Sequence, residues 1–324
     1  MAGQRPYVLV LNAPGDPALP GLEALENRAE VRQVDSESAL VDALPRTDIL
    51  VVTDFRTDLL SRCWPAEHRI RWVHASSAGV DALMFPALRE SGVVLTNARG
   101  VFDRGIAEYV LGAVLLFAKD TLGNLRHQRA HRWHHRNTRL IDGARALVVG
   151  AGSIGEEVAR LLSAAGMRVC GTARSAREQP PFEAVYPNDA LLELLPEQDY
   201  VVITAPLTDT TRGLFDRRAF AAMREGACLI NVGRGPIVQT DALVEALESG
   251  RLTGAALDVF EEEPLPAGHP LWDQPGVMIS AHMAGDFDGW QRALGEQFVA
   301  NFDRWERGEV LFNLIDLETG FPAR

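Results

Sequence analysis

The chain has 324 residues, of which 47% are hydrophobic and 23% charged, a balance typical of a packed globular protein with room for two domains. Its 32 Lys and Arg against 44 Asp and Glu give a net charge of −12, which argues against nucleic-acid or anionic-membrane partners. No stretch approaches the roughly 20 apolar residues that span a bilayer, and the first apolar run is too short for a signal peptide. Three widely spaced cysteines, Cys63, Cys170 and Cys228, indicate reduced thiols rather than disulfides. We therefore expect a cytoplasmic protein.

The first third of the chain alternates short apolar runs with helix-like stretches, and the runs predict strands at Tyr7–Leu11, Ile49–Thr53, Trp72–His74 and Val93–Leu95. Because parallel neighbouring strands need a crossover between them, usually a helix, this alternation indicates a parallel α/β sheet.

A long apolar helix is predicted at Ile106–Lys119. Its apolar residues cover most of the helix circumference, so it should be buried on more than one side. A homodimer interface through the region around residues 101–140 would supply that burial, and an ordinary core helix is the alternative.

A second alternating series follows residue 140. It predicts helices at Glu156–Ala165 and Thr240–Glu248, and a last helix at Gly289–Arg307. The strands that it predicts are Ala146–Gly150, Arg168–Gly171, Tyr200–Thr204, Ala227–Val232, Thr253–Leu257 and Val277–Ile279.

The strongest local signal is the glycine-rich turn that follows the strand at 146–150 and opens a helix. Gly150 permits the tight turn, Gly152 lets the backbone approach a pyrophosphate, and Gly155 allows close packing of helix and strand. The N–H groups of Ser153, Ile154 and Gly155 at the helix start would face the phosphates. The alternative is a tight turn in an α/β domain that binds no dinucleotide.

The end of the next strand indicates which dinucleotide is bound. NAD sites place an Asp or Glu about 20 residues after the turn to bind the ribose 2′-OH. Here the sequence has Arg174, Ser175 and Arg177 and no carboxylate. Guanidinium groups pair well with a 2′-phosphate, so NADP(H) is favoured over NAD(H). The alternative is that both arginines are solvated surface residues.

Further motifs follow in a fixed order: Ser76–Asp81, Gly150–Gly155, Thr204–Thr208, Asn231–Gly235, Ala256–Pro264 and Ala281-His282. With these motifs, nearly the whole chain resembles the D-isomer-specific 2-hydroxyacid dehydrogenase family. The arginines after the second strand look most like its glyoxylate/hydroxypyruvate reductase branch.

The resemblance implies three catalytic residues. Arg234 offers a charged fork for the carboxylate of a 2-keto acid. His282 is the general acid that protonates the reduced carbonyl, and Glu263 orients its imidazole and stabilises the imidazolium. Taken singly, each also has a structural reading: a surface turn, an exposed loop acid and a structural histidine.

The resemblance also implies further binding residues. The backbone N–H groups of Ala78 and Gly79 would bind the substrate carboxylate with Arg234, and Asp258 would lie near the nicotinamide. Other cofactor contacts are expected at Ala205, Pro206, Val232, Gly233, Gly285 and His282. Family members often have proline before the histidine, where this chain has Ala281. The segment Met283–Trp290 is also less typical, which leaves the shape of the substrate pocket open.

A segment rich in His and Arg, residues 126–136, is best explained as a solvated helix beside the cleft or a dimer interface. His127 and His131 are four residues apart, but no carboxylate or cysteine completes a metal site and the arginines would repel a cation. We expect no metal.

These observations predict two Rossmann-like, doubly wound parallel-sheet domains with a cleft between them. Residues 1–98 and 288–324 would form a discontinuous substrate domain, and residues 99–287 the dinucleotide-binding domain. The expected activity is hydride transfer between a nicotinamide cofactor and a small 2-keto or 2-hydroxy acid. The alternative is a non-enzymatic NAD(P)-sensing protein resembling corepressors on the same fold. Phosphoglycerate dehydrogenase is disfavoured because no added regulatory domain is visible.

Overall fold

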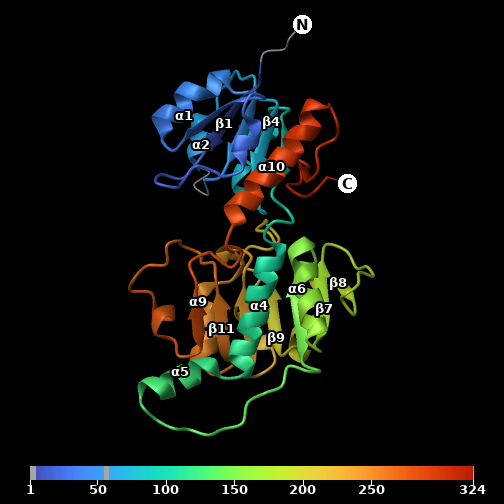
Figure 1. Ribbon diagram of the computed structural model, residues 1–324. Helices are drawn as coiled ribbons and strands as arrows, with labels where there is room; N and C mark the ends of the chain where they lie inside the picture. Colours follow the sequence, from blue (N-terminus) through green and yellow to red (C-terminus); the bar gives the residue numbers. More distant parts are fainter. Residues whose placement is uncertain (1–4, 55–57, 324) are drawn as a thin grey trace. The chain divides into compact units, whose positions relative to one another are not determined.

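The computed structural model describes residues 5–54 and 58–323. By its internal contacts the chain divides into two compact units, and each is described here by itself (Figure 1). The first unit comprises Met1–Phe102 and Phe287–Arg324, and the second comprises Asp103–Asp286. Within the described residues, no helix is both long and apolar enough to cross a membrane.

The first unit is built on a six-stranded sheet with the order β13-β5-β4-β3-β1-β2. Its strands are β1 (Tyr7–Leu11), β2 (Glu30–Val34), β3 (Ile49–Val52), β4 (Trp72–Ala75), β5 (Val94–Asn97) and β13 (Leu314–Ile315). The strands pair in parallel except for β13, which runs antiparallel to β5. The order 2-1-3-4-5 of the parallel strands is that of a doubly wound sheet.

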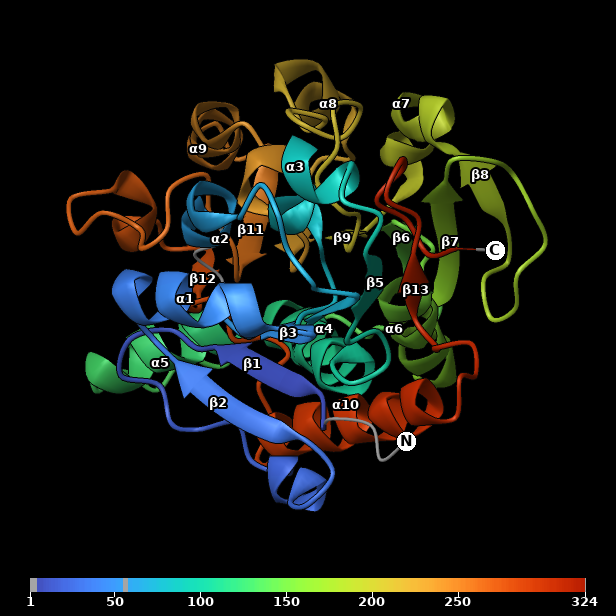
Figure 2. The same ribbon diagram turned by 90° about the horizontal axis from the view of Figure 1, so that it is seen from above.

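Helices cover both faces of this sheet (Figure 2). They are α1 (Glu37–Ala43), α2 (Asp58–Cys63), α3 (Pro86–Arg89) and α10 (Trp290–Glu306). Since side chains alternate along a strand, β4 serves both faces. Val73 joins the apolar cluster that includes residues of α1, α2 and α3, whereas Trp72 stacks on Phe298 of α10 with ring centroids 5.0 Å apart.

The second unit is built on a seven-stranded, wholly parallel sheet with the order β12-β11-β10-β9-β6-β7-β8. Its strands are β6 (Arg145–Val149), β7 (Arg168–Ala173), β8 (Val185–Pro187), β9 (Tyr200–Ile203), β10 (Ala227–Asn231), β11 (Leu252–Leu257) and β12 (Val277–Ile279). The order reverses direction between β6 and β9, the switch point at which doubly wound sheets bind dinucleotides. Two Rossmann-like parallel-sheet units confirm the predicted fold class.

The helices of the second unit are α4 (Asp103–Ala118), α5 (Thr121–Arg129), α6 (Ser153–Ala164), α7 (Leu191–Leu194), α8 (Arg217–Ala222) and α9 (Thr240–Glu248). Figure 2 shows α7, α8 and α9 along one face of the sheet and α4 and α6 along the other. On the first face, Phe215, Phe220 and Leu243 are fully or almost fully buried in one apolar cluster with the sheet. On the second face, Phe117 of α4 lies against Gly254 of β11.

Helix α4 buries one face and leaves another partly open. Val110 and Val114 are fully buried, whereas the side chain of Leu115 is 39% exposed. Burial inside the unit therefore explains only part of the apolar circumference that the sequence shows.

Candidate functional site

Six strands of the second sheet end at positions singled out in the sequence. Because the strands are parallel, their carboxyl ends lie along one edge of the sheet, the edge at which α/β proteins bind ligands. The residues that follow the strands there are Gly150 after β6, Arg174 after β7, Ala205 after β9, Val232 after β10, Asp258 after β11 and His282 after β12. Residues far apart in the chain therefore share one edge.

The turn after β6 requires its glycines. Gly150 has φ +113°, and a Cβ there would lie 2.6 Å from the backbone nitrogen of Ala205. A Cβ on Gly155 would lie 2.1 Å from the carbonyl oxygen of Gly150. Side chains at either position would push β6, β9 and α6 apart, as the sequence motif predicts.

Gly152 differs from its two neighbours because it faces open space. Among the described residues, no heavy atom lies within 4 Å of a Cβ built there. Helix α6 begins at Ser153, so the N–H groups of Ser153, Ile154 and Gly155 belong to a first turn that lacks intrahelical acceptors. An open backbone beside the positive end of a helix fits a dinucleotide pyrophosphate.

The residues predicted to select the cofactor follow β7 directly. Arg174, Ser175 and Arg177 are all exposed. Arg177 donates to the carbonyl oxygen of Ala151 at 2.8 Å and to Oε1 of Gln179 at 2.8 Å. Its guanidinium is thus attached to the glycine turn.

The turns after β9 and β10 approach one another closely at this edge. A Cβ on Gly233 would lie 2.8 Å from the carbonyl oxygen of Ala205. Thr211 donates to the carbonyl of Pro206 at 2.7 Å, and Val232 is buried. The four predicted contact residues, Ala205, Pro206, Val232 and Gly233, therefore lie in neighbouring turns.

Arg234 is held by the two glycines that flank it. A Cβ on Gly235 would lie 1.8 Å from the carbonyl carbon of Phe260, so that glycine lets the Arg234 segment pack against the chain after β11. The side chain of Asn231 accepts from Gly233 N–H at 3.1 Å and donates to the carbonyl of Arg234 at 3.2 Å. This packing makes the Gly-Arg-Gly segment part of the sheet edge rather than a surface turn.

His282 and Glu263, 19 residues apart, are joined by a hydrogen bond. The imidazole Nδ1 lies 2.8 Å from Oε2 of Glu263. The other oxygen of Glu263 accepts the backbone N–H of Phe260 at 2.8 Å, which fixes the orientation of the carboxylate. Because Nδ1 binds Glu263, Nε2 is the ring nitrogen through which the imidazole would act as a general acid.

The pair shifts both pKa values toward an ion pair. The hydrogen bond that His282 donates to Glu263 and the charge of Glu263 raise the pKa of His282 above the ordinary value, against burial and the charge of Arg234. Burial favours the neutral form of Glu263, but hydrogen bonds from His282 and Phe260 and the nearby positive charges hold its pKa below the ordinary value. His282 therefore keeps its proton to higher pH than a free histidine does.

This shift predicts the pH dependence of carbonyl reduction. Protonated His282 is the active form, so kcat should be constant at low pH and fall as pH rises through the raised pKa. Glu263→Gln should move that fall to lower pH, because it removes the interactions that raise the pKa of His282. The measurement is kcat against pH for wild type, Glu263→Gln and the exposed neighbour Glu262→Gln. An unchanged midpoint in Glu263→Gln, or a shift of equal size in Glu262→Gln, would contradict the assignment.

Asp258 is almost fully buried behind the loop that carries His282. Its carboxylate accepts the N–H groups of Met283 and Ala284, each at 2.9 Å, and the hydroxyl of Ser280 at 2.5 Å. Gly285 follows within the turn closed by Asp286 N–H and the carbonyl of Met283 at 2.9 Å. Asp258 thus binds the histidine loop, and a contact to the nicotinamide stays a prediction.

Ala78 and Gly79 lie in the first unit, in the loop after β4. Asn97 donates to the carbonyl oxygen of Ala78 at 2.6 Å, and Ser77 donates to that of Gly79 at 2.7 Å. In a trans peptide the N–H points opposite to the C=O. The N–H of Gly79 therefore points away from Asn97.

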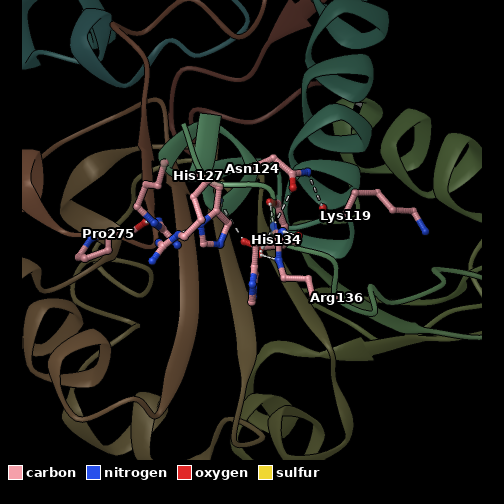
Figure 3. A network of polar contacts seen from close by, with 10 residues as sticks. Lys119, Asn124, His127, His134, Arg136 and Pro275 are labelled. Carbon is pink, nitrogen blue, oxygen red and sulfur yellow. Dashed lines mark hydrogen bonds and ion pairs between the residues drawn. The ribbon is translucent and has the colours of Figure 1, made fainter. Parts of the chain in front are cut away.

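The His- and Arg-rich segment forms α5 and the loop that follows it. Figure 3 shows His127 beside His134. The ring centroids of the two histidines are 4.6 Å apart, and Arg136 donates to Oδ1 of Asn124 at 2.8 Å. Nδ1 of His127 accepts from Arg132 at 2.9 Å, and α5 ends before His131. The described residues contain no group of three or more His, Cys, Asp or Glu arranged to hold a metal.

Three polar residues at this edge escape the sequence analysis: Tyr109, Ser280 and Gln179. Gln179 binds Arg177 and also Glu156 of α6, the latter at 2.9 Å. Tyr109 of α4 lies 2.7 Å from Ser280, between hydroxyl oxygens. No spacing rule predicts the second contact, because the two residues are 171 positions apart.

Comparison with known proteins identifies the family. Residues 111–284 match the family model described as D-isomer specific 2-hydroxyacid dehydrogenase, NAD binding domain. A glyoxylate reductase of Aeropyrum pernix is 32% identical over 270 residues, which are 81% of this chain and 79% of that protein. A glyoxylate/hydroxypyruvate reductase A of Serratia proteamaculans is 31% identical over 262 residues, 78% of this chain and 82% of that protein.

Solved structures give the same result across nearly the whole chain. An NADPH-dependent glyoxylate/hydroxypyruvate reductase from Sinorhizobium meliloti, in complex with NADP and sulfate, has a TM-score of 0.85 at 28% identity, covering 98% of this chain and 100% of that one. A D-isomer specific 2-hydroxyacid dehydrogenase from Xanthobacter autotrophicus, in complex with NADPH and MES, has a TM-score of 0.81 at 31% identity, covering 97% and 99%. The chain therefore belongs to the D-isomer specific 2-hydroxyacid dehydrogenase family and is an NAD(P)-dependent oxidoreductase.

Proposed function

We propose that this enzyme reduces a small 2-keto acid of the glyoxylate or hydroxypyruvate type, with NADPH as the preferred cofactor. The observation that carries the proposal is the 2.8 Å contact between His282 and Glu263, on the sheet that also bears the glycine turn and Arg234. A proton donor, its carboxylate partner and a fixed guanidinium are what reduction of a 2-keto acid requires.

Each of these residues has a separate role in the proposed reaction. When bound, NADPH supplies the hydride. The first turn of α6 and the open backbone at Gly152 would hold its pyrophosphate. Arg234 binds the carboxylate of the substrate and so orients the carbonyl. His282 donates a proton from Nε2 to the oxygen of the reduced carbonyl, and Glu263 stabilises the imidazolium beforehand.

The substrate assignment is tested by turnover with a panel of keto acids. Glyoxylate, hydroxypyruvate and bulkier 2-keto acids are each mixed with enzyme and either NADPH or NADH, and the loss of reduced cofactor is followed by absorbance. The highest kcat/KM should fall on glyoxylate or hydroxypyruvate with NADPH. Turnover confined to bulkier 2-keto acids would reject the proposed substrate class. Binding of NADPH without turnover of any keto acid would favour the alternative of a non-enzymatic NAD(P)-sensing protein. The named relatives reported above are reductases and dehydrogenases, so they lend the sensor no support.

The proposed preference for NADPH is assigned to Arg174, whose side chain is exposed directly after β7, where no carboxylate follows the strand. Arg174→Ala should raise the KM for NADPH about 10-fold or more, since a hydrogen bond to a charged group is worth roughly 1.5–3 kcal/mol. The KM for NADH should stay within about 2-fold of wild type, because that cofactor lacks the phosphate.

A matched control exists on the same strand. Arg168 starts β7 at the opposite edge and pairs with Glu183 at 2.8 Å, both side chains being about half exposed. Arg168→Ala should leave both KM values unchanged. Equal increases for NADPH and NADH in Arg174→Ala would count against a phosphate contact.

We also propose a homodimer through the region around residues 101–140. Trp133 is 99% exposed and Leu140 77% exposed, and α4 leaves Leu115 39% exposed. Residues 121–140 include five arginines and no carboxylate, in a chain with a net charge of −12, so the segment is complementary in charge to a second copy.

Light scattering should give twice the mass of one chain, and the double variant Trp133→Ser with Leu140→Ser should give the mass of the monomer. The control Val310→Ser, at a position 71% exposed outside this region, should remain dimeric. A monomeric wild type would end this part of the proposal.

The cytoplasm is the proposed location. Cys63, Cys170 and Cys228 are all free, as expected for thiols kept in a reducing compartment.

A further inference from the structure

Three hydrogen-bonded polar side chains connect α4 to the loop that carries His282. The hydroxyl oxygen of Tyr109 lies 2.7 Å from Oγ of Ser280, and Ser280 donates to Oδ1 of Asp258 at 2.5 Å. Tyr109 and Ser280 are half-buried, and Asp258 is only 2% exposed. All three lie in the second unit.

The direction of these hydrogen bonds follows from counting protons. A carboxylate only accepts, and a serine hydroxyl has a single proton. Since Ser280 gives that proton to Asp258, the proton between Tyr109 and Ser280 must come from Tyr109. Burial raises the pKa of Tyr109, so its hydroxyl remains protonated over the working pH range. Tyr109 therefore donates to Ser280, and Ser280 donates to Asp258.

Asp258 in turn holds His282 through three backbone contacts. Its carbonyl oxygen accepts the N–H of His282 at 2.8 Å, and its carboxylate accepts the N–H groups of the next two residues, each at 2.9 Å. His282 has φ +53°, a left-handed conformation that a residue with a Cβ adopts at a cost of roughly 1 kcal/mol. These contacts hold the backbone in the conformation that directs the imidazole toward Glu263.

We propose that Tyr109 and Ser280 are positioning residues for the catalytic imidazole, acting through Asp258. The proposal rests on the function proposed above. Removing the Ser280 hydroxyl leaves Oδ1 of Asp258 and the Tyr109 hydroxyl each short of one partner. The carboxylate then moves toward other donors, the loop loses its fixed conformation, and the His282–Glu263 contact is made only part of the time.

The test compares Ser280→Ala and Tyr109→Phe with Ser280→Thr, which keeps the hydroxyl. Ser280→Ala should lower kcat about 10-fold, since misplacement of a catalytic group by about 1 Å costs up to about 100-fold, and Tyr109→Phe should lower it by a smaller factor. The KM for NADPH should stay within about 2-fold of wild type, and Ser280→Thr should restore most of kcat. Tyr200→Phe is the matched control, because Tyr200 is a buried tyrosine at the start of β9, on the opposite edge of the same sheet.

A second readout does not depend on turnover. With ¹³C-labelled histidine, the resonance of His282 is assigned by its loss in His282→Gln, and its titration midpoint is measured by NMR. The midpoint should fall in Ser280→Ala and Tyr109→Phe and stay at the wild-type value in Tyr200→Phe. Wild-type kcat and midpoint in both variants would overturn the proposal, and so would a fall of kcat matched by equal rises in the KM for NADPH. If the wild-type enzyme turns over no keto acid, the proposed function fails. The NMR comparison still decides whether Tyr109 and Ser280 position His282.

Discussion

His282→Gln is expected to lower kcat for keto-acid reduction about 100- to 10,000-fold, the range that a positioned general acid contributes. Glutamine keeps a polar side chain of similar size, but it cannot deliver a proton to the carbonyl oxygen. It also releases Glu263, whose Oε2 loses the partner at 2.8 Å. The measurement is kcat under saturating NADPH and substrate, with the KM for NADPH determined in parallel.

The control for this variant is His269→Gln. His269 lies in the same unit and accepts the N–H of Leu271 at 3.2 Å, away from the catalytic pair. Its kcat should remain within about 2-fold of wild type, because the lost contact is one neutral hydrogen bond. If His282→Gln retained more than a tenth of the wild-type kcat, another group would have to supply the proton, and the assignment of the general acid would be wrong.

Arg234→Gln is expected to lower kcat/KM for the keto acid about 100-fold or more. A guanidinium forms two parallel hydrogen bonds to a carboxylate, and each bond to a charged group is worth roughly 1.5–3 kcal/mol. The two flanking glycines fix the backbone of this segment against the turns after β9 and β11, so a neighbouring arginine is poorly placed to substitute. Arg234→Lys should recover only part of the loss, because lysine keeps the charge and lacks the planar fork.

Steady-state kinetics with glyoxylate and NADPH separate the outcomes. Loss of carboxylate binding raises the KM for glyoxylate, and loss of orientation lowers kcat, whereas the KM for NADPH should change little. The control is Arg218→Gln, at an exposed position of α8. A KM for glyoxylate that stayed at the wild-type value in Arg234→Gln, with kcat also unchanged, would remove Arg234 from the substrate site.

The net charge of the whole chain does not describe the charge beside Arg234, and both matter for these predictions. The chain carries −12 overall, yet within the second unit the positive charge of Arg234 acts on the imidazole of His282 and opposes the rise of its pKa. The hydrogen bond between His282 and Glu263 offsets the repulsion between Arg234 and the protonated imidazole. An anionic substrate is therefore attracted by a local arrangement that net charge alone would not suggest.

Local sequence signals were sufficient for several elements. Strands β1 and β12 and helix α9 have the predicted bounds, because apolar runs and a terminal glycine act over a few residues. The glycine turn after β6 was also predictable, because its motif lies within one strand–helix unit. Contacts with neighbouring backbone require Gly150 and Gly155, and Gly152 leaves open space beside the turn. The motif order then indicated the family.

Two of the edge strands, β2 and β8, were not predicted, whereas the edge strand β12 was. Strand β2 has the sequence EVRQV and is mostly half-buried, and β8 has only three residues and ends in proline. Their polar and short sequences lack the apolar run that marks a buried strand. They become strands because β1 and β7 present free edges to them.

By itself, the sequence determined the fold class, the glycine turn and the types of residue that the chemistry needs. Only the tertiary structure decided which of these side chains meet: His282 with Glu263, Arg177 with the carbonyl of Ala151, and Tyr109 with Ser280. The physical reason is that such contacts depend on the order of parallel strands and on loop conformations with positive φ, as at His282. Both are set by the packing of the whole sheet, and residues up to 171 positions apart come into contact through it.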